Sequence, residues 1–102
     1  MNVLDYMTKD EAIVLAAVLL DGGKDKELWR GFEDFDFKSH AAEVIANVVC
    51  AVSADVDLDV ITVFEEALAE EREEACSMEM LTAICQCIQP REKTLGILRG
   101  AV

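Results

Sequence analysis

Four acidic residues in the middle of the chain have the spacing of a calcium-binding loop. Asp55, Asp57, Asp59 and Glu66 match the first, third, fifth and twelfth positions of an EF-hand loop. The sixth position of such a loop needs glycine for a sharp turn, but Val60 stands there, and a β-branched side chain is strained at positive φ. Asp57 or Asp59 can instead cap a following helix and favour its positive dipole end. We therefore expect a helix cap here and no metal site.

The residues suited to nucleophilic or phosphate chemistry do not form a recognisable set. His40 directly follows Ser39, and two sequence neighbours do not give the geometry of a catalytic triad. A helix N-cap followed by an exposed imidazole explains the pair better. The Gly-Gly-Lys run at 22–24 is followed by Asp25, whereas a phosphate-binding loop needs Ser or Thr at that place. We expect neither enzymatic activity nor a cofactor.

The four cysteines, Cys50, Cys76, Cys85 and Cys87, are expected to be reduced and mostly packed. A helical domain with this much aliphatic material does not need disulfides. On a helix the side chains of Cys85 and Cys87 point roughly 200° apart, so they cannot hold one metal ion unless the helix is broken.

The charge is strongly negative and unevenly distributed. The 102 residues carry a formal net charge of −12, and 53% of them are hydrophobic, which excludes a disordered chain. Acidic and basic residues number nine and five in 1–40, ten and one in 41–75, and two and three in 76–102. Such a surface repels phosphate, so direct binding of nucleic acid is not expected. A basic patch on a protein partner suits it better.

Neither a membrane segment nor a secretory signal is predicted. No apolar run reaches the roughly 18 residues of a membrane helix, and no basic region leads into an apolar stretch at the N-terminus. We therefore expect a cytoplasmic location. The length fits a single helical domain over 1–102, with a flexible start at about 1–7 and an end near 99–102 that is frayed or truncated.

Hydrophobic spacing predicts an all-α fold, a compact bundle of about five to six helices. Thr8 and Glu11 form a capping box that opens a helix over about 9–20. This helix is apolar on every side, so it should be the central one, and Asp21 with two glycines ends it. A short second helix follows over 26–32, and Ser39 is the expected N-cap of the third.

The later helices are predicted from apolar stripes and their boundaries. The fourth starts near residue 60, the fifth follows Ser77 and ends before Pro90, and the sixth spans about 91–98. The positions expected to be buried are Leu28, Trp29 and Phe32 in the second helix; Ala41, Ala42, Val44, Ile45, Val48, Val49 and Val52 in the third; Val60, Ile61, Phe64, Ala67 and Leu68 in the fourth; Met78, Leu81, Ile84, Cys85 and Ile88 in the fifth; and Leu95 and Leu98 in the sixth.

The order of several motifs resembles the N-terminal domain of DnaB-type replicative helicases. The run EAIVLAAVLLD at 11–21 is similar to the opening helix of that family, and Trp29 fits its second helix. Asp-Phe at 36–37 and the helix after it fit the next part of the pattern. The run LDVITV at 58–63 is similar to the signature that opens the family's fourth helix. The similarity is continuous from residue 11 to about 68 and looser beyond.

This resemblance implies a DnaB N-terminal-domain-like fold and a protein-interaction role in DNA replication. The implied partners are a replicative helicase, its primase or a helicase loader, with a homo-oligomer as a further option. A segment of a longer helicase and a free-standing relative both remain open. The alternative is a small acidic adaptor or inhibitor, for instance one encoded by a phage, that occupies a basic protein surface.

The candidate interaction residues are one tryptophan and four acids. Trp29 is chosen because tryptophan is enriched at interface hot spots, although a place in the core is the commoner role. Glu65, Glu66, Glu70 and Glu71 are chosen because they belong to the acidic part of the chain and fall largely outside the apolar stripe of their helix.

Overall fold

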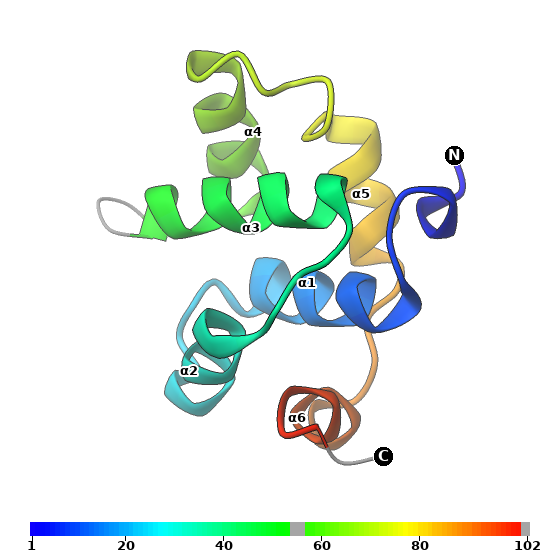
Figure 1. Ribbon diagram of the computed structural model, residues 1–102. Coiled ribbons are helices and arrows are strands. Elements are labelled where there is room, and N and C mark those ends of the chain that lie inside the picture. The colour runs from blue at the N-terminus through cyan, green and yellow to red at the C-terminus, as the bar shows by residue number, and fades with distance from the viewer. Residues whose placement is uncertain (54–56, 101–102) are drawn as a thin grey trace.

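Six α-helices and one short 3-10 helix make up the part of the chain that the computed structural model describes, residues 1–53 and 57–100. They are η1 (Val3–Asp5), α1 (Lys9–Asp21), α2 (Lys26–Asp34), α3 (His40–Ser53), α4 (Val60–Ala69), α5 (Met78–Cys85) and α6 (Arg91–Leu98) (Figure 1). No strand occurs within these residues. The Cα radius of gyration, 12.2 Å, is close to the roughly 13 Å of a compact domain of this length. The predicted all-α class is confirmed.

Helix α1 lies at the centre of the molecule because almost its whole circumference is apolar. Every residue from Glu11 to Leu19 is buried, and the helix contacts η1, α2, α3, α5 and α6. It starts at the predicted capping box, in which the Glu11 N–H donates to the Thr8 hydroxyl and the Thr8 N–H donates to the Glu11 carboxylate. Gly22 ends it with a φ of 74°, which glycine adopts without steric cost. The central first helix is therefore confirmed.

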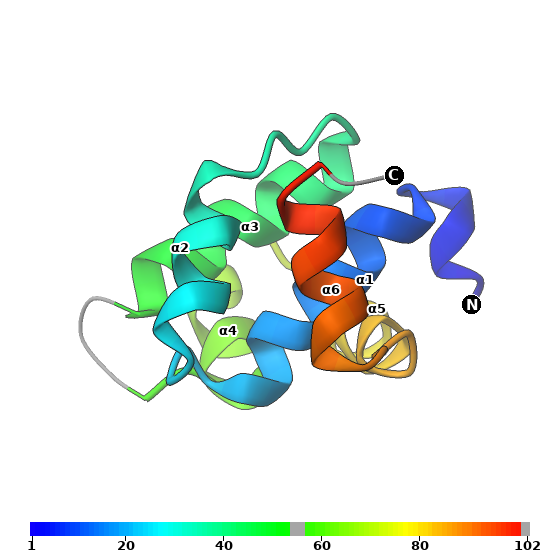
Figure 2. The same cartoon turned by 90° about the horizontal axis from the view of Figure 1, so that it is seen from below.

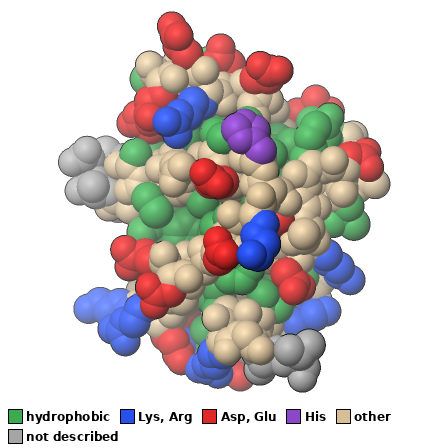
Figure 3. All heavy atoms as spheres, viewed as in Figure 1, with side chains coloured by type: hydrophobic (Ala, Val, Ile, Leu, Met, Phe, Trp, Pro, Cys, Tyr) green, Lys and Arg blue, Asp and Glu red, His purple; other side chains and the backbone are tan. Residues whose placement is uncertain are grey.

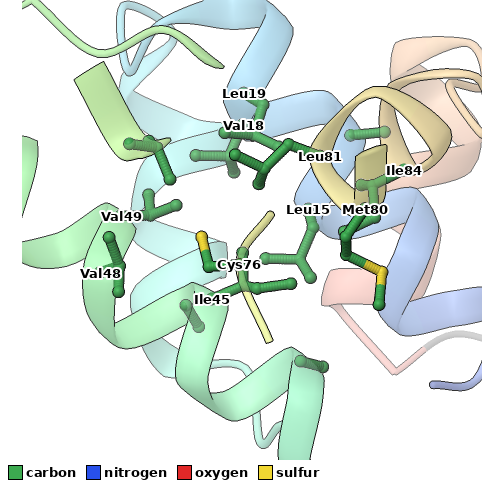
Figure 4. Close-up of a cluster of buried hydrophobic side chains, with 14 of the residues drawn as sticks. Leu15, Val18, Leu19, Ile45, Val48, Val49, Cys76, Met80, Leu81 and Ile84 are labelled. Atoms are coloured by element: carbon green, nitrogen blue, oxygen red, sulfur yellow. The ribbon is translucent and has the colours of Figure 1, made fainter. Parts of the chain in front are cut away.

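The main core forms where α3 and α5 pack on α1. Figure 4 shows side chains from the three helices converging, with the Cys76 side chain between them. The stripe predicted for α3 is buried apart from Val44, which is half-buried. The labelled side chains, all buried, are Leu15, Val18 and Leu19 from α1, Ile45, Val48 and Val49 from α3, and Met80, Leu81 and Ile84 from α5, with Cys76.

The buried face of α5 differs from the predicted stripe. Met80 and Leu81 are buried in the first turn, whereas Met78, the first residue of the helix, is 38% exposed. Ile88 is 44% exposed because α5 ends at Cys85, so this residue does not continue the helical spacing. The prediction for Met78 and Ile88 was wrong: Met78 lies at the exposed start of α5, and Ile88 follows the end of the helix, where the helical period no longer applies.

Helices α2 and α6 pack against each other and against α1, on the side away from α3 (Figures 1 and 2). Ala17, Leu28 and Leu95 form a small second cluster between the three helices. The contact between α2 and α6 is close at Gly31, where an added Cβ would lie 2.9 Å from Cδ1 of Leu98. The absence of a side chain at Gly31 thus sets how near α6 can approach α2.

Ion pairs at the surface connect the same two helices. Arg91 Nε lies 2.6 Å from Asp25 Oδ2, and Arg91 Nη2 lies 2.9 Å from Glu27 Oε1. Arg99 also pairs with Glu27. Hydrogen bonds from Arg91 lower the pKa of both carboxyls below their usual range. Arg91, Arg99 and Glu27 are exposed and Asp25 is half-buried, so the pairs orient α6 more than they stabilise it.

The N-terminal residues, for which a flexible start over 1–7 was predicted, include a short helix. Residues Val3–Asp5 form η1, with the Asn2 side chain accepting a hydrogen bond from the Leu4 N–H at 3.1 Å. Val3 and Met7 are buried in the main core, because η1 packs against α1 and α5. Of the predicted frayed end, residues 101–102 lie outside the described part of the chain.

Candidate interaction surface

Helix α4 begins at a capping box that uses one of the acids considered for calcium. The Asp59 carboxylate accepts a hydrogen bond from the Thr62 N–H at 2.8 Å, and the Thr62 hydroxyl accepts one from the Asp59 N–H at 3.0 Å. The prediction that Asp57 or Asp59 caps this helix is confirmed for Asp59. Asp55 lies outside the described residues. Within those residues, no group of three His, Cys, Asp or Glu side chains comes together as a metal site.

Only part of the apolar surface of α4 is buried against the other helices. Val63 and Ala67 are fully buried, and Val60 and Phe64 are half-buried. The predicted burial of Ile61 and Leu68 was wrong, since they are 60% and 47% exposed, and Val63 was not among the positions predicted to be buried. The reason is that α4 packs on α3 and α5 through the side that carries Val63 and Ala67. Its exposed side therefore keeps two large aliphatic side chains.

The four candidate acids lie along α4 and directly after it. Glu65 is exposed and is four residues from Ile61 and three from Leu68, which places it on the same side of the helix. Glu66 is half-buried, while Glu70, the C-cap residue, is exposed. Glu71 is also exposed and has a φ of 57°, a left-handed conformation that turns the chain away from the helix.

The turn after α4 is held by backbone hydrogen bonds and by one buried cysteine. The Arg72 N–H donates to the Ala67 carbonyl at 2.7 Å, and the Cys76 N–H donates to the Arg72 carbonyl at 3.1 Å. Cys76 is fully buried and returns the chain to the core. Between these points the side chains at 70–74 are exposed. The fold thus presents this acidic segment to solvent on a defined turn.

The acids in the region around α4 far outnumber the bases there. Figure 3 shows acidic side chains over much of the visible face, including the top, where α4 and the following turn lie, while most of the Lys and Arg side chains are in the lower half. Residues 57–79 carry nine acids and a single base, Arg72. Its Nε lies 3.9 Å from Glu70 Oε1, and both side chains are exposed. The region around α4 is therefore strongly negative.

Trp29 lies apart from the acids at the end of α4. Its ring is half-buried and packs on the core, with its centroid 5.1 Å from that of Phe32. It lines a hollow together with Lys24 and Leu58, next to the start of α4. Glu70 and Glu71 stand beyond the other end of that helix, about 15 Å along its axis. The fold does not bring the tryptophan and these two acids into one site.

Glu11 has hydrogen-bond partners that the sequence did not predict. Its side chain is 3% exposed, and beyond the capping box it accepts hydrogen bonds from the Lys38 N–H at 2.7 Å and from the Ser39 N–H at 3.0 Å. The Ser39 hydroxyl, expected to cap α3, also donates to Glu11, at 2.6 Å. Burial raises the pKa of this carboxyl, but the hydrogen bonds lower it more, so that it falls to about 2. Hydrogen bonds between residues this far apart in the chain cannot be predicted from a local sequence pattern.

The cysteines and the histidine form no reactive arrangement among the described residues. All four cysteines are free thiols, as predicted, although Cys50 is exposed rather than packed. Burial raises the pKa of Cys85, and raises that of Cys76 to about 11. A raised pKa keeps a thiol protonated, whereas a nucleophile needs the thiolate. His40 is exposed at the first position of α3, as predicted.

Comparisons with protein-family models, with curated proteins and with solved structures give no match for this chain. Within the described residues, no helix is both long and apolar enough to cross a lipid bilayer.

Proposed function

We propose that this chain is a non-catalytic protein-interaction domain of the DNA replication machinery, of the kind found at the N-terminus of DnaB-type helicases. The observation that carries the proposal is the agreement between the order of the motifs and the order of the helices. The motif at 11–21 forms the central α1, Trp29 lies in α2, the Asp-Phe pair at 36–37 precedes α3, and the motif at 58–63 runs into α4.

A binding role also fits the chemistry of the side chains. The pKa of the Glu11 carboxyl is lowered to about 2, yet its oxygens accept hydrogen bonds from Thr8, Lys38 and Ser39. A carboxylate held in this way stabilises a loop and is poorly placed to accept a proton from a substrate. Helix α4 exposes acidic side chains together with large aliphatic ones, and this combination suits contact with another protein.

The expected partners are a replicative helicase, its primase or its loader. We would measure the mass of the protein in solution by light scattering, alone and after mixing with each partner at low salt. We expect a complex of defined stoichiometry. The domain alone should not hydrolyse ATP. The absence of a complex with all three partners would contradict the replication role.

A small acidic adaptor or inhibitor is the second candidate function. The observation that favours it is the excess of nine acids over one base in 57–79, on a surface that repels nucleic acid. Such a protein would occupy a basic surface through charge, so its complex would weaken steeply as salt screens the charges. A complex that keeps its affinity at high salt would exclude this candidate and leave the first.

A further inference from the structure

The exposed side of α4 combines aliphatic and acidic side chains in one stripe, which we call the α4 face: Ile61, Phe64, Glu65 and Leu68. Side chains three, four and seven residues apart lie on one side of a helix. Ile61 and Leu68 are 60% and 47% exposed, and Phe64 between them is half-buried and packs on the core below. Two large aliphatic groups therefore remain in water on a helix whose other side is anchored to the core.

The acidic turn at 70–74 continues this surface beyond the end of the helix. Glu70, Glu71, Glu73 and Glu74 are exposed there, and no basic residue occurs in the last turn of α4. The C-terminus of a helix carries a partial negative charge, so acids next to it repel the helix dipole as well as one another. A cation bound at this end would relieve both repulsions. Arg72, paired with Glu70, supplies only one positive charge.

We propose that the α4 face and the acidic turn together form the docking surface for a basic amphipathic helix of a partner protein. Aliphatic side chains of that helix, spaced by three, four or seven residues, would cover Ile61 and Leu68. Its Lys and Arg side chains would lie over Glu65 and over the acids at 70–74. This proposal rests on the interaction role proposed above, and it specifies the surface and the chemistry of the partner.

The charges favour a basic helix over two other possible binding partners of this surface, a second copy of the chain and nucleic acid. A second copy of the chain would bring a net charge of −12 against the same acidic surface. Nucleic acid would bring phosphates, which the acids repel. A helix with basic edges supplies the opposite charge together with the apolar groups, so it satisfies both parts of the stripe.

The test is a titration of the isotope-labelled protein with a synthetic helical peptide, followed by the NMR shifts of backbone amides. The peptide has about 14 residues, all Leu or Lys, with the leucines on one side of the helix. We expect shifts concentrated in residues 60–74, and weaker binding at about 300 mM salt than at about 50 mM. The variants Ile61→Ser and Leu68→Ser should each raise the dissociation constant about tenfold or more.

Two matched controls separate this surface from nonspecific attraction. The variant Leu20→Ser removes a side chain that is 55% exposed on α1, and it should leave the dissociation constant unchanged. A peptide of the same composition with its leucines scattered around the helix should bind at least about tenfold more weakly. The amide spectrum and the melting temperature of each variant show whether it is folded. Both should stay close to those of the wild type, because the replaced positions of α4 are exposed.

Three results would overturn the proposal: no shifts with the amphipathic peptide, shifts centred outside 60–74, or equal binding of the scattered peptide. These results are distinguishable from a failure of the proposed function. If helicase, primase or loader binds while the peptide does not, the replication role stands and the docking surface is wrong. If the peptide binds at α4 and none of the three proteins does, the docking surface stands and the replication role is wrong.

Discussion

The Ser39 hydroxyl donates a 2.6 Å hydrogen bond to the carboxylate of Glu11, a residue 28 positions earlier in the chain. Together with the N–H groups of Lys38 and Ser39, this contact fastens the segment before α3 to the first turn of α1. The same carboxylate closes the capping box with Thr8. One buried side chain thus fixes both the start of the central helix and the position of the next long one.

The substitution Glu11→Gln should destabilise the protein by about 2–3 kcal/mol. An amide offers one oxygen and one NH₂ group, so donors that now face carboxylate oxygens would face a donor instead, and buried donors would be left unpaired. The free energy of unfolding in urea measures the loss. The matched control is Glu33→Gln, an exposed acid of α2, which should change it by less than about 0.5 kcal/mol. Equal stability of the two variants would contradict the structural role of Glu11.

The stabilisation from Glu11 should depend on pH. Its pKa is about 2 in the folded state against an ordinary value of 4.5, so folding favours the charged form. The contribution, about 3 kcal/mol, is fully present above pH 4.5 and is lost as the pH falls toward 2.

Comparison of the wild type with Glu11→Gln isolates this effect from the other acids of the chain. The difference between their unfolding free energies should be largest at neutral pH and should shrink between pH 4.5 and 2, because a protonated Glu11 lacks the charge just as the glutamine of the variant does. Urea titrations at several pH values measure it. A difference that stays constant over this range would show that the charge of Glu11 does not contribute.

Two alanine substitutions on opposite sides of α4 should have very different effects. Val63 is fully buried, so Val63→Ala would leave a cavity and lower the free energy of unfolding by about 2 kcal/mol. Ile61 is 60% exposed, so Ile61→Ala should change it by less than about 0.5 kcal/mol. Thermal unfolding followed by circular dichroism distinguishes them. The reverse order would mean that α4 packs on the core through its other side.

The substitution Gly31→Ala should destabilise the contact between α2 and α6 by about 1 kcal/mol. The new Cβ would lie 2.9 Å from Cδ1 of Leu98 and 3.1 Å from its Cβ, so the Leu98 side chain, or α6 with it, would have to shift. In the background of Leu98→Ala the nearest of these atoms is absent, and the better helix propensity of alanine should offset most of the loss. A double-mutant cycle in urea measures this coupling, and strictly additive effects would contradict the close approach.

The sequence by itself determined where the helices lie and how several of them begin. The capping boxes at Thr8 and Asp59, the apolar circumference of α1 and the stop at Gly22 all depend on residues within about four positions of one another. Because these interactions join residues that are close in the sequence, a local pattern is enough to reveal them. The excess of acids around α4 was equally visible, because it is a matter of composition.

The tertiary structure alone decided which apolar residues stay exposed and which distant groups meet. The stripe of α4 is too wide to be buried, and only the approach of α3 and α5 selects Val63 over Ile61. Likewise, η1 is held by its packing on α1 and α5, and Glu11 meets Ser39 only when α3 takes its place. These outcomes depend on contacts between residues far apart in the sequence, whose energies no local pattern contains.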